Sequence, residues 1–463
     1  MEARTLKFVA EAVGGKLLHG NPQAWVRRVS SDSRSVASGD LFLAIKGERF
    51  DGHDFLKEVA AKGVAAMVVA QGREPKSATC PVIVVDDPRA ALGRLAAAYR
   101  REHSLPVIAV GGSNGKTTTK DLIASVLRQK LSTLNSDASF NNDIGVPVTL
   151  LRLEKGHAAA VLEVGTNHPG ELAPLVKMIQ PRYGVITSIG REHLEFFGDI
   201  AGVAREEGTL GELLPGDGKL LINGDSEWSP AIIGRTRAAA LRVGAGKGND
   251  WRVTTVRHEK QHLVFQVGAP LKDFSGDYQI RLLGRHQAVN ALFAIALGAE
   301  LGLSPAEIRR GLELCEPAKM RNQLWEVAGV QLLEDCYNAN ADSMLAALQT
   351  LMDLPCKGRR IAILGDMAEL GAASEAAHAE VGRRAAELGV GQLIAVGRMA
   401  GVMAGGARSL DLNRVFEFPD VEAAAQAAKD YVKAGDLVLL KASRSTRLER
   451  IAEALRSEGV RKS

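Results

Sequence analysis

The stretch that decides the fold of this chain is LPVIAVGGSNGKTTTK, residues 105–120. Its first six residues form an apolar run that predicts a buried strand, and the apolar residues after the glycines return at helical spacing. The turn between them reads Gly112-Ser113-Asn114-Gly115-Lys116-Thr117-Thr118. A glycine-rich turn at a helix N-terminus aims backbone N–H groups and the positive end of the helix dipole at an anion. The sequence therefore predicts a phosphate-binding loop in an α/β protein.

Two side chains of this loop have roles that follow from their chemistry. Lys116 can neutralise the β and γ oxygens of a nucleotide, and Thr117 can offer its hydroxyl to Mg²⁺. The usual spacing would place a glycine at position 110, where this chain has Val110, so the loop is a short variant. The alternative, a glycine turn that only caps a structural helix, is disfavoured by the strand before it and the helix after it.

Composition limits the other classes of protein. A length of 463 residues predicts about three domains, and 58 basic against 54 acidic residues leave a net charge of +4, too little to indicate nucleic acid binding. The four cysteines lie too far apart for a CxxC clip, which predicts free thiols and no zinc site. The chain has neither an apparent signal peptide nor a long apolar run, so we expect a cytoplasmic protein with no membrane insertion.

The order of predicted elements indicates three α/β domains. Residues 1–104 alternate short β-like runs with helical patterns, and residues 105–316 begin at the phosphate loop and contain a β-rich insertion near Trp251. After the turn-rich CEPAKMRNQ, residues 317–463 repeat strand and helix and predict a parallel sheet.

Two further residues are candidates for metal or phosphate contact. Glu163 lies in the apolar run LEVG, and a buried carboxylate is costly unless it is paired or bound to metal. We interpret it as a Mg²⁺ ligand, with a structural hydrogen-bond acceptor as the alternative. His193 follows the apolar strand YGVITSI, where α/β sheets carry functional loops. A structural histidine is the alternative there.

Other polar residues are weaker candidates taken singly. Asn141 and Asn142 in SFNNDIGVP fit either a substrate contact or an Asx turn. Near the second boundary or at strand ends are residues suited to gripping a base, ribose or phosphate, with surface or capping roles as the alternative: His286, Asn290, Arg321, Asp335, Asn338 and Asn340.

Taken in order, the motifs resemble the Mur ligases of bacterial cell-wall synthesis over nearly the whole chain. They are GGSNGKTTTK, SFNNDIGVP, LEVGTNHPGEL, SIGREHLEFFG, LLGRHQAVNALFAIALG, MRNQ, DCYNANADSM and ILGDMAELG. Within the family, YNANADSM, LGDMAELG and HLEFFG are similar to the member that joins D-alanyl-D-alanine to UDP-N-acetylmuramoyl-tripeptide through an acyl phosphate made with ATP. One departure is Ala442, where relatives commonly carry glycine.

The resemblance implies an α/β fold of three domains: an N-terminal UDP-substrate-binding domain, a central P-loop ATPase-like domain with a mainly parallel sheet, and a C-terminal Rossmann-like domain. It implies ATP and Mg²⁺ as cofactors, with UDP-N-acetylmuramoyl-tripeptide and D-alanyl-D-alanine as substrates. We expect a monomer. Whether lysine or diaminopimelate is the third residue of the tripeptide stays open.

The resemblance also implies roles for individual residues. Lys116, Glu163 and His193 would be catalytic; Thr117 and Glu163 would hold one Mg²⁺ and His193 a second. Asn290, Arg321 and Asp335 would contact adenine, phosphate and ribose, alongside the loop residues 112–118. Substrate contacts would come from Ser31, Asp32, Ser33, Arg34, Asn141, Asn142, Asn338 and Asn340.

Many Mur ligases carry a carbamylated lysine on the helix after the HLE turn, and this chain has none there. Counting fourteen residues on from His193 reaches Glu207, while Arg205 stays protonated and cannot form a carbamate. We hypothesise that Glu207 supplies a permanent carboxylate for the metal. The alternative is that Glu206 and Glu207 form a solvated pair.

Two other functions remain alternatives. One is another ATP-dependent acid:amino acid ligase on the same scaffold, such as the preceding Mur ligase or folylpolyglutamate synthase. The other is a P-loop regulator without ligase activity, which would need neither a UDP-type domain nor a closing Rossmann-like domain.

Overall fold

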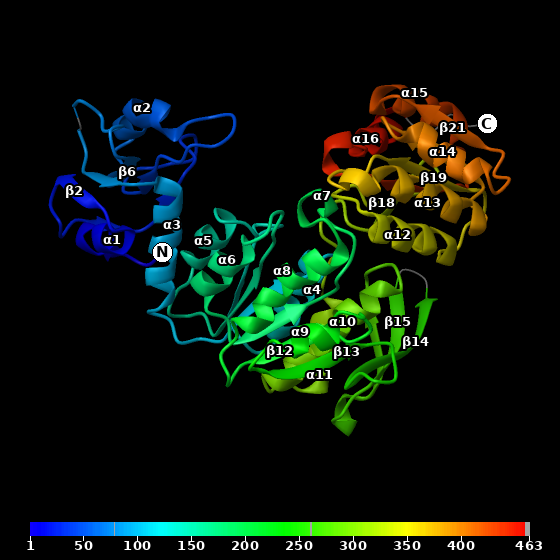
Figure 1. Ribbon diagram of the computed structural model, residues 1–463, viewed down its shortest axis with the longest axis horizontal. Coiled ribbons are helices and arrows are strands. Elements are labelled where there is room, and N and C mark those ends of the chain that lie inside the picture. The colour runs from blue at the N-terminus through cyan, green and yellow to red at the C-terminus, as the bar shows by residue number, and fades with distance from the viewer. Residues whose placement is uncertain (78, 260–261, 459–463) are drawn as a thin grey trace.

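The computed structural model describes residues 1–77, 79–259 and 262–458. In this part of the chain, three α/β units follow one another along the sequence (Figure 1). Each unit has one large sheet, whose strands all come from one continuous segment of the chain. The sheets are mixed but mostly parallel, which confirms the predicted fold class. No helix among the described residues combines the length and the apolar character needed to cross a membrane.

The N-terminal unit has a five-stranded sheet in the order β2-β7-β6-β5-β4, in which only β2 runs antiparallel to its neighbour. Its strands are β2 (Lys16–His19), β4 (Val29–Ser30), β5 (Leu41–Leu43), β6 (Ala66–Ala70) and β7 (Val82–Val85), with a small separate pair, β1 (Arg4–Thr5) and β3 (Trp25–Val26). Its helices are α1 (Leu6–Val13), α2 (Leu56–Ala61) and α3 (Pro88–Arg100), and η1 (Gly52–Phe55) is a 3₁₀ turn.

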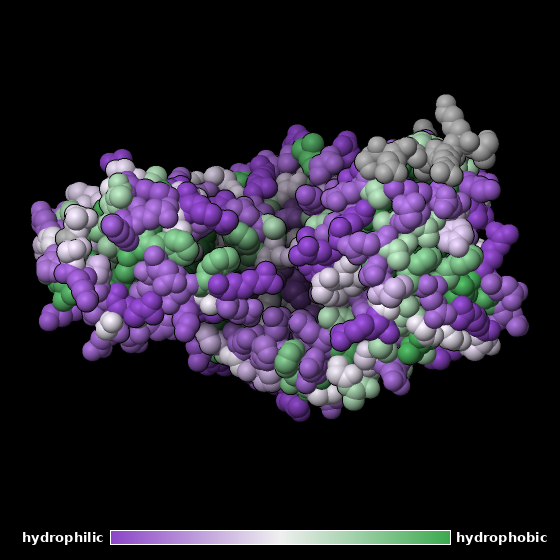
Figure 2. Space-filling model, turned by 90° about the horizontal axis from the view of Figure 1, so that it is seen from above, coloured by the Kyte–Doolittle hydropathy of each residue, from purple (hydrophilic) through white to green (hydrophobic). Residues whose placement is uncertain are grey.

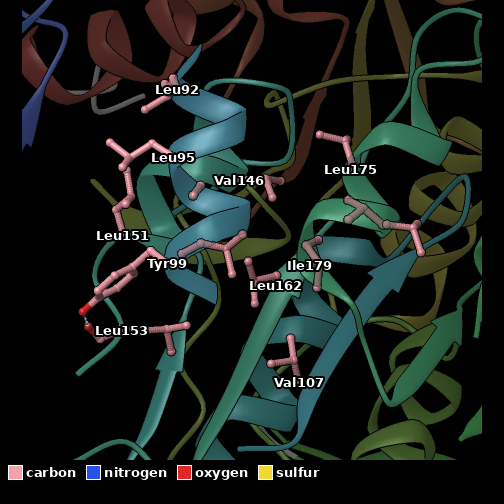
Figure 3. Close-up of a cluster of buried hydrophobic side chains, with 14 of the residues drawn as sticks. Leu92, Leu95, Tyr99, Val107, Val146, Leu151, Leu153, Leu162, Leu175 and Ile179 are labelled. Atoms are coloured by element: carbon pink, nitrogen blue, oxygen red, sulfur yellow. Dashed lines mark hydrogen bonds between the residues drawn. The ribbon is translucent and has the colours of Figure 1, made fainter. Parts of the chain in front are cut away.

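Helix α3 attaches this unit to the next one. It starts with Pro88 in its first turn, where the missing N–H costs nothing, and the side chain of Asp87 caps it. Its buried Leu92, Leu95 and Tyr99 belong to one hydrophobic cluster with apolar residues of the central unit (Figure 3). The Tyr99 hydroxyl donates a hydrogen bond to the carbonyl of Leu153 at 2.6 Å. The first two units therefore share a core.

The central unit has a nine-stranded sheet in the order β16-β15-β14-β13-β12-β11-β8-β10-β9. Its strands are β8 (Val107–Gly111), β9 (Thr133–Asn135), β10 (Ala159–Glu163), β11 (Tyr183–Ile186), β12 (Lys219–Asn223), β13 (Ala239–Gly244), β14 (Trp251–Glu259), β15 (His262–Gly268) and β16 (Gly276–Ile280). Strands β8 to β14 are parallel, and β14, β15 and β16 form the antiparallel extension expected near Trp251. Its helices are α4 (Lys116–Leu127), α5 (Gly145–Leu150), α6 (Leu172–Ile179), α7 (Leu194–Phe197), α8 (Ile200–Glu212), α9 (Ser229–Ile233), α10 (His286–Glu300) and α11 (Pro305–Glu313), with the 3₁₀ turn η2 (Lys272–Phe274).

The topology of this sheet determines where a site can form. Strand β8 pairs with β10 on one side and β11 on the other, so the chain changes direction across the sheet at β8. All residues of β8, β10 and β11 are buried, as expected for parallel strands covered on both faces. Ligands of such sheets bind beyond the carboxyl ends of the strands at this switch point. The phosphate loop and Glu163 both lie there.

The C-terminal unit has a six-stranded sheet in the order β17-β18-β22-β19-β20-β21, parallel except for β17. Its strands are β17 (Gln323–Val327), β18 (Val330–Glu334), β19 (Arg360–Gly365), β20 (Gln392–Val396), β21 (Val415–Phe418) and β22 (Leu437–Lys441). Its helices are α12 (Ala341–Asp353), α13 (Ser374–Glu387), α14 (Ala400–Arg408), α15 (Val421–Tyr431) and α16 (Glu449–Glu458), with the 3₁₀ turns η3 (Gly371–Ala373) and η4 (Arg444–Thr446). The last strand lies between β18 and β19, so its end meets the end of β18.

Candidate functional site

The phosphate loop is the turn between β8 and α4, and its glycines are required by geometry. Gly112 and Gly115 have φ angles of +107° and +86°, values that side chains disfavour. A side-chain carbon at Gly115 would lie 2.7 Å from Oδ1 of Asn290, and one at Gly112 would lie 2.6 Å from Oγ1 of Thr187. No side chain caps α4, so the N–H groups of its first turn are left for a ligand.

Lys116, the first residue of α4, lies folded against this loop. Its Nζ donates to the carbonyls of Gly112 at 2.5 Å and Ser113 at 3.2 Å, and lies 3.3 Å from Oε2 of Glu192. Burial alone would lower the pKa of Lys116, but Glu192, Glu207 and Glu163 outweigh it, so the pKa is raised. The side chain is therefore a cation at neutral pH.

Glu163 ends β10 beside Val110 and is 1% exposed. Its Oε1 accepts a hydrogen bond from Nδ2 of Asn141 at 2.8 Å, while its Oε2 is buried without a partner. Asn142 accepts from the N–H groups of Ile144 and Gly145, which is the Asx-turn arrangement considered above. In this structure Asn141 orients Glu163, and Asn142 shapes the turn before α5.

Glu207 lies on α8 and is 1% exposed, so the alternative of a solvated pair with Glu206 is wrong. Its Oε2 accepts from the backbone N–H of Gly112 at 2.6 Å, and its Oε1 is buried without a partner. Burial raises the pKa of Glu207 to about 8, against the influence of Lys116. Glu206 instead accepts from the N–H groups of Gly170 and Leu172.

The residues proposed for Mg²⁺ fit such an ion in their chemistry. Oγ1 of Thr117, Oε2 of Glu163 and Oε1 of Glu207 are all buried oxygens that lack a hydrogen-bond partner. Such groups are costly to bury unless something binds them, and oxygen is the donor that Mg²⁺ prefers. Among the described residues, however, no three acidic, histidine or cysteine side chains are gathered closely enough to hold a metal by themselves. Mg²⁺ usually completes its shell with water and substrate phosphates.

His193 lies at the start of α7 with a φ of +48°. Its Nδ1 is 2.5 Å from Oε2 of Glu369, a residue of the C-terminal unit. The ring is thus fixed between the central and C-terminal units.

A cavity of about 580 Å³ lies between the central and C-terminal units. The molecule is hollowed near its middle on the face seen in Figure 2, with hydrophilic residues around the hollow. Most of the predicted site residues line the cavity: Ser113, Asn114, Gly115, Lys116, Thr117, Thr118, Asn141, Asn142, Glu163, His193, Asn290, Arg321, Asp335, Asn338 and Asn340. The structure therefore brings together residues that are far apart in sequence.

The C-terminal side of the cavity is charged. Nζ of Lys441, at the end of β22, lies 2.5 Å from Oδ2 of Asp335, just after β18. The guanidinium of Arg321 lies 4.2 Å from the ring centre of Tyr337. Asn340 caps α12 and also donates from Nδ2 to Oδ1 of Asn114 at 3.0 Å, which links this unit to the phosphate loop.

Comparison with known proteins agrees with this arrangement. Three family models match consecutive parts of the chain: "Mur ligase family, catalytic domain" at residues 26–100, "Mur ligase middle domain" at 110–298, and "Mur ligase, glutamate ligase domain" at 320–444. The chain is 35% identical to the UDP-N-acetylmuramoyl-tripeptide–D-alanyl-D-alanine ligase of Bacillus subtilis (strain 168), covering 98% of this chain and 99% of the relative. The chain belongs to the Mur ligase family. This confirms the resemblance found in its motifs.

Solved structures of Mur ligases have the same fold. A MurF structure from Acinetobacter baumannii matches with a TM-score of 0.91 at 32% identity, covering 99% of this Mur ligase and all of that chain. The MurF ligase of Thermotoga maritima in complex with ADP matches with a TM-score of 0.81 at 26% identity, covering 94% of this chain and 98% of that one.

One of the alternatives also appears among the structural matches. The folylpolyglutamate synthase of Mycobacterium tuberculosis, complexed with ADP and AMPPCP, matches with a TM-score of 0.63 at 16% identity, covering 81% of this chain and 95% of that one. At that identity the likeness shows a shared fold alone, so the comparisons favour the Mur ligase interpretation.

Some predicted residues of this Mur ligase lie outside the cavity. Ser31, Asp32, Ser33 and Arg34 form a turn after β4 in the N-terminal unit. Arg34 donates two hydrogen bonds to the carboxylate of Asp32, which lowers the pKa of Asp32 to about 2. Glu207 lies beneath the loop rather than on the cavity wall.

Sequence reasoning missed several residues that line the cavity, among them Glu192, Tyr337 and Lys441. Glu192 precedes His193 within one of the quoted motifs, and Tyr337 and Lys441 lie in or beside others. A charged residue such as Lys441 at the end of an apolar strand is a signal that could have been used, because the carboxyl ends of parallel strands carry ligands.

Proposed function

We propose that this Mur ligase joins D-alanyl-D-alanine to the C-terminal carboxylate of UDP-N-acetylmuramoyl-tripeptide, with ATP converted to ADP and phosphate. The product is UDP-N-acetylmuramoyl-pentapeptide, a precursor of peptidoglycan. The proposal rests on the cavity, in which the phosphate loop and the uncapped N-terminus of α4 face polar residues of the C-terminal unit. The close match to the Bacillus relative of that name supports the choice of substrates.

The division of labour follows the three sheets. We propose residues 1–104 as the UDP-substrate-binding domain, residues 105–316 as the ATP-binding domain, and residues 317–463 as the domain that closes over the site. The turn of Ser31, Asp32, Ser33 and Arg34 would contact the uridine diphosphate. ATP and a UDP-linked precursor are intracellular metabolites, so the proposed location is the cytoplasm.

The reaction needs activation because a carboxylate is a poor electrophile. In the proposed sequence, an oxygen of the tripeptide carboxylate attacks the γ-phosphorus of ATP, giving an acyl phosphate and ADP. The amine of D-alanyl-D-alanine then attacks the acyl carbon, and the tetrahedral intermediate expels phosphate. Catalysis of this kind depends on positioning and on electrostatic stabilisation, which explains why no serine or cysteine nucleophile is required.

Within this scheme each side chain has a role. Lys116 and the N–H groups of the first turn of α4 bind the β and γ phosphates, as the geometry of the loop allows. Asn290, Arg321 and Asp335 contact the rest of the nucleotide, while Asn141, Asn142, Asn338 and Asn340 would meet the peptide substrates. Residues that would hold Mg²⁺ are Thr117, Glu163, His193 and Glu207; the ion supplies positive charge that offsets the charge of the phosphates.

A substrate competition assay tests the proposal. Release of ADP is measured with UDP-N-acetylmuramoyl-tripeptide and ATP, adding D-alanyl-D-alanine, D-glutamate, L-glutamate or diaminopimelate, and the product mass is determined. We expect turnover with the dipeptide alone and a mass gain of one dipeptide less water. Turnover with a single amino acid would favour another ligase of the scaffold, and ADP release that ignores every acceptor would favour a nucleotide switch. Running both the lysine and diaminopimelate tripeptides identifies the third residue.

A further inference from the structure

Glu192 is a buried carboxylate of the site that takes no part in the proposed reaction. It lies between β11 and α7, next to His193, and its side chain is 7% exposed. Its Oε2 is 3.3 Å from Nζ of Lys116, whose other two contacts are neutral backbone carbonyls. Among the described residues, Glu192 is therefore the anion in direct contact with the loop lysine.

This ion pair stands where a nucleotide would bind. Lys116, Glu192 and Thr117 line the same cavity, and the phosphates that Lys116 is expected to bind must reach Nζ from that cavity. A phosphate oxygen can take the place of Oε2 only if the carboxylate of Glu192 gives up its partner. Glu192 therefore competes with an incoming phosphate for the ammonium of Lys116.

A buried carboxylate that loses its counter-ion must find another, because an unpaired buried charge is strongly unfavourable. Among the residues that the structure describes, no other cation contacts Glu192. Two oxygens that lack a partner, Oε2 of Glu163 and Oγ1 of Thr117, belong to residues that line the same cavity. The group as a whole has more acidic than basic side chains, and a nucleotide adds further negative charge. A divalent cation is the species that would satisfy these oxygens and Glu192 together.

We propose that Glu192 exchanges partners during nucleotide binding: its carboxylate releases Lys116 to the phosphates and turns to the divalent cation that arrives with them. Glu192 is then a positioning residue that makes tight nucleotide binding depend on the metal. This inference rests on the proposed function, because it assumes that a nucleotide occupies the loop. The competing view is that Glu192 is a fixed counter-ion that keeps Lys116 in place throughout.

Calorimetric titration with ADP separates the two views. The parent protein, Glu192→Gln and Glu192→Asp are titrated in EDTA and again with saturating Mg²⁺. The control is Glu195→Gln, which removes an exposed carboxylate three residues along the same segment. In EDTA, we expect Glu192→Gln to bind ADP about fivefold more tightly than the parent, because the lysine has lost its competitor. Mg²⁺ should increase the affinity of the parent for ADP, and this increase should be smaller by about fivefold or more in Glu192→Gln. In Glu192→Asp and Glu195→Gln, the increase should stay near that of the parent.

The outcomes are distinct. Weaker binding of ADP by Glu192→Gln in EDTA would show that Glu192 orients Lys116 for phosphate and would overturn the exchange. An unchanged affinity in EDTA, or an unchanged gain from Mg²⁺, would overturn it equally. A parent protein that binds no ADP under either condition would contradict the nucleotide site itself, and with it the proposed function. Thermal melting of each variant checks that the fold is kept, and Glu192→Ala, which also removes the carboxylate, replaces Glu192→Gln if that variant does not fold.

Discussion

Lys116 is the residue on which the chemistry of this site depends most. Its ammonium is the basic group of the phosphate loop, and contacts with the loop carbonyls and with Glu192 hold it at the N-terminus of α4. We expect Lys116→Ala to keep the fold and to lower ligase turnover by about 100-fold or more, because charge on the transferring phosphoryl group is left uncompensated. Circular dichroism and turnover are measured together. A variant that retains more than about a tenth of the parent rate would refute the assignment.

Glu207 offers a second test at the same scale, because its two oxygens have different partners. Oε2 accepts from the N–H of Gly112, and Oε1 has none. Glu207→Ala removes both and leaves a buried N–H unsatisfied, at a cost of about 1–3 kcal/mol in stability. Glu207→Gln keeps an acceptor for Gly112 but cannot release a proton to bind a cation as a carboxylate, so it isolates the proposed metal role.

We therefore expect Glu207→Gln to melt near the parent temperature but to need a higher Mg²⁺ concentration for half-maximal turnover. Glu207→Lys should regain part of its activity with added bicarbonate, and the parent should not respond to bicarbonate. If Glu207→Gln and the parent show the same Mg²⁺ dependence, Glu207 serves only to hold the loop.

Helices, strands and turns that depend on the local sequence pattern could be predicted. The apolar run, the glycine turn and the helical spacing predicted β8, the loop and α4, because each signal lies within a few residues of the next. The contacts that the pattern cannot show are those between distant segments. Asn141 follows β9 and donates a hydrogen bond to Glu163, twenty-two positions away, a contact that depends on the pairing of β10 with β9. Glu192 and Lys441 were missed for the same reason.

Helix α12 gives a prediction for an element. Asn340 caps it, accepting from the N–H of Ser343, and its amide also donates to Asn114. Asn340→Ala should cost about 1 kcal/mol and speed hydrogen exchange in the first turn of α12 about fivefold. Asn340→Asp keeps the acceptor and should exchange near the parent rate, while it loses the donor to Asn114 and binds nucleotide less tightly. Equal rates of hydrogen exchange in Asn340→Ala and Asn340→Asp would show that the cap does not stabilise α12.

For the whole molecule, the cavity depends on how the C-terminal unit sits against the central unit. Arg191 of the central unit pairs with Asp342 and with Glu380, and His193 meets Glu369. The N-terminal unit is attached on the other side, through the core around α3 (Figure 1). Nucleotide and UDP-substrate contacts should therefore be separable by mutation.

Arg321 tests this separation. It belongs to the C-terminal side of the cavity and rests on Tyr337. We expect Arg321→Ala to weaken binding of a non-hydrolysable ATP analogue about tenfold, consistent with loss of one charge-assisted contact, and to leave the affinity for UDP-N-acetylmuramoyl-tripeptide nearly unchanged. Separate calorimetric titrations decide the matter. Equal losses for both ligands would contradict the division between the units.

The most direct test of the central claim follows the oxygen atoms of the substrate. UDP-N-acetylmuramoyl-tripeptide is labelled with ¹⁸O in both oxygens of its terminal carboxylate, and the released phosphate is analysed by mass spectrometry after turnover with ATP and D-alanyl-D-alanine. If an acyl phosphate forms, each phosphate carries one ¹⁸O and the new amide carbonyl keeps the other. Unlabelled phosphate, or release of AMP and pyrophosphate, would contradict the proposed reaction.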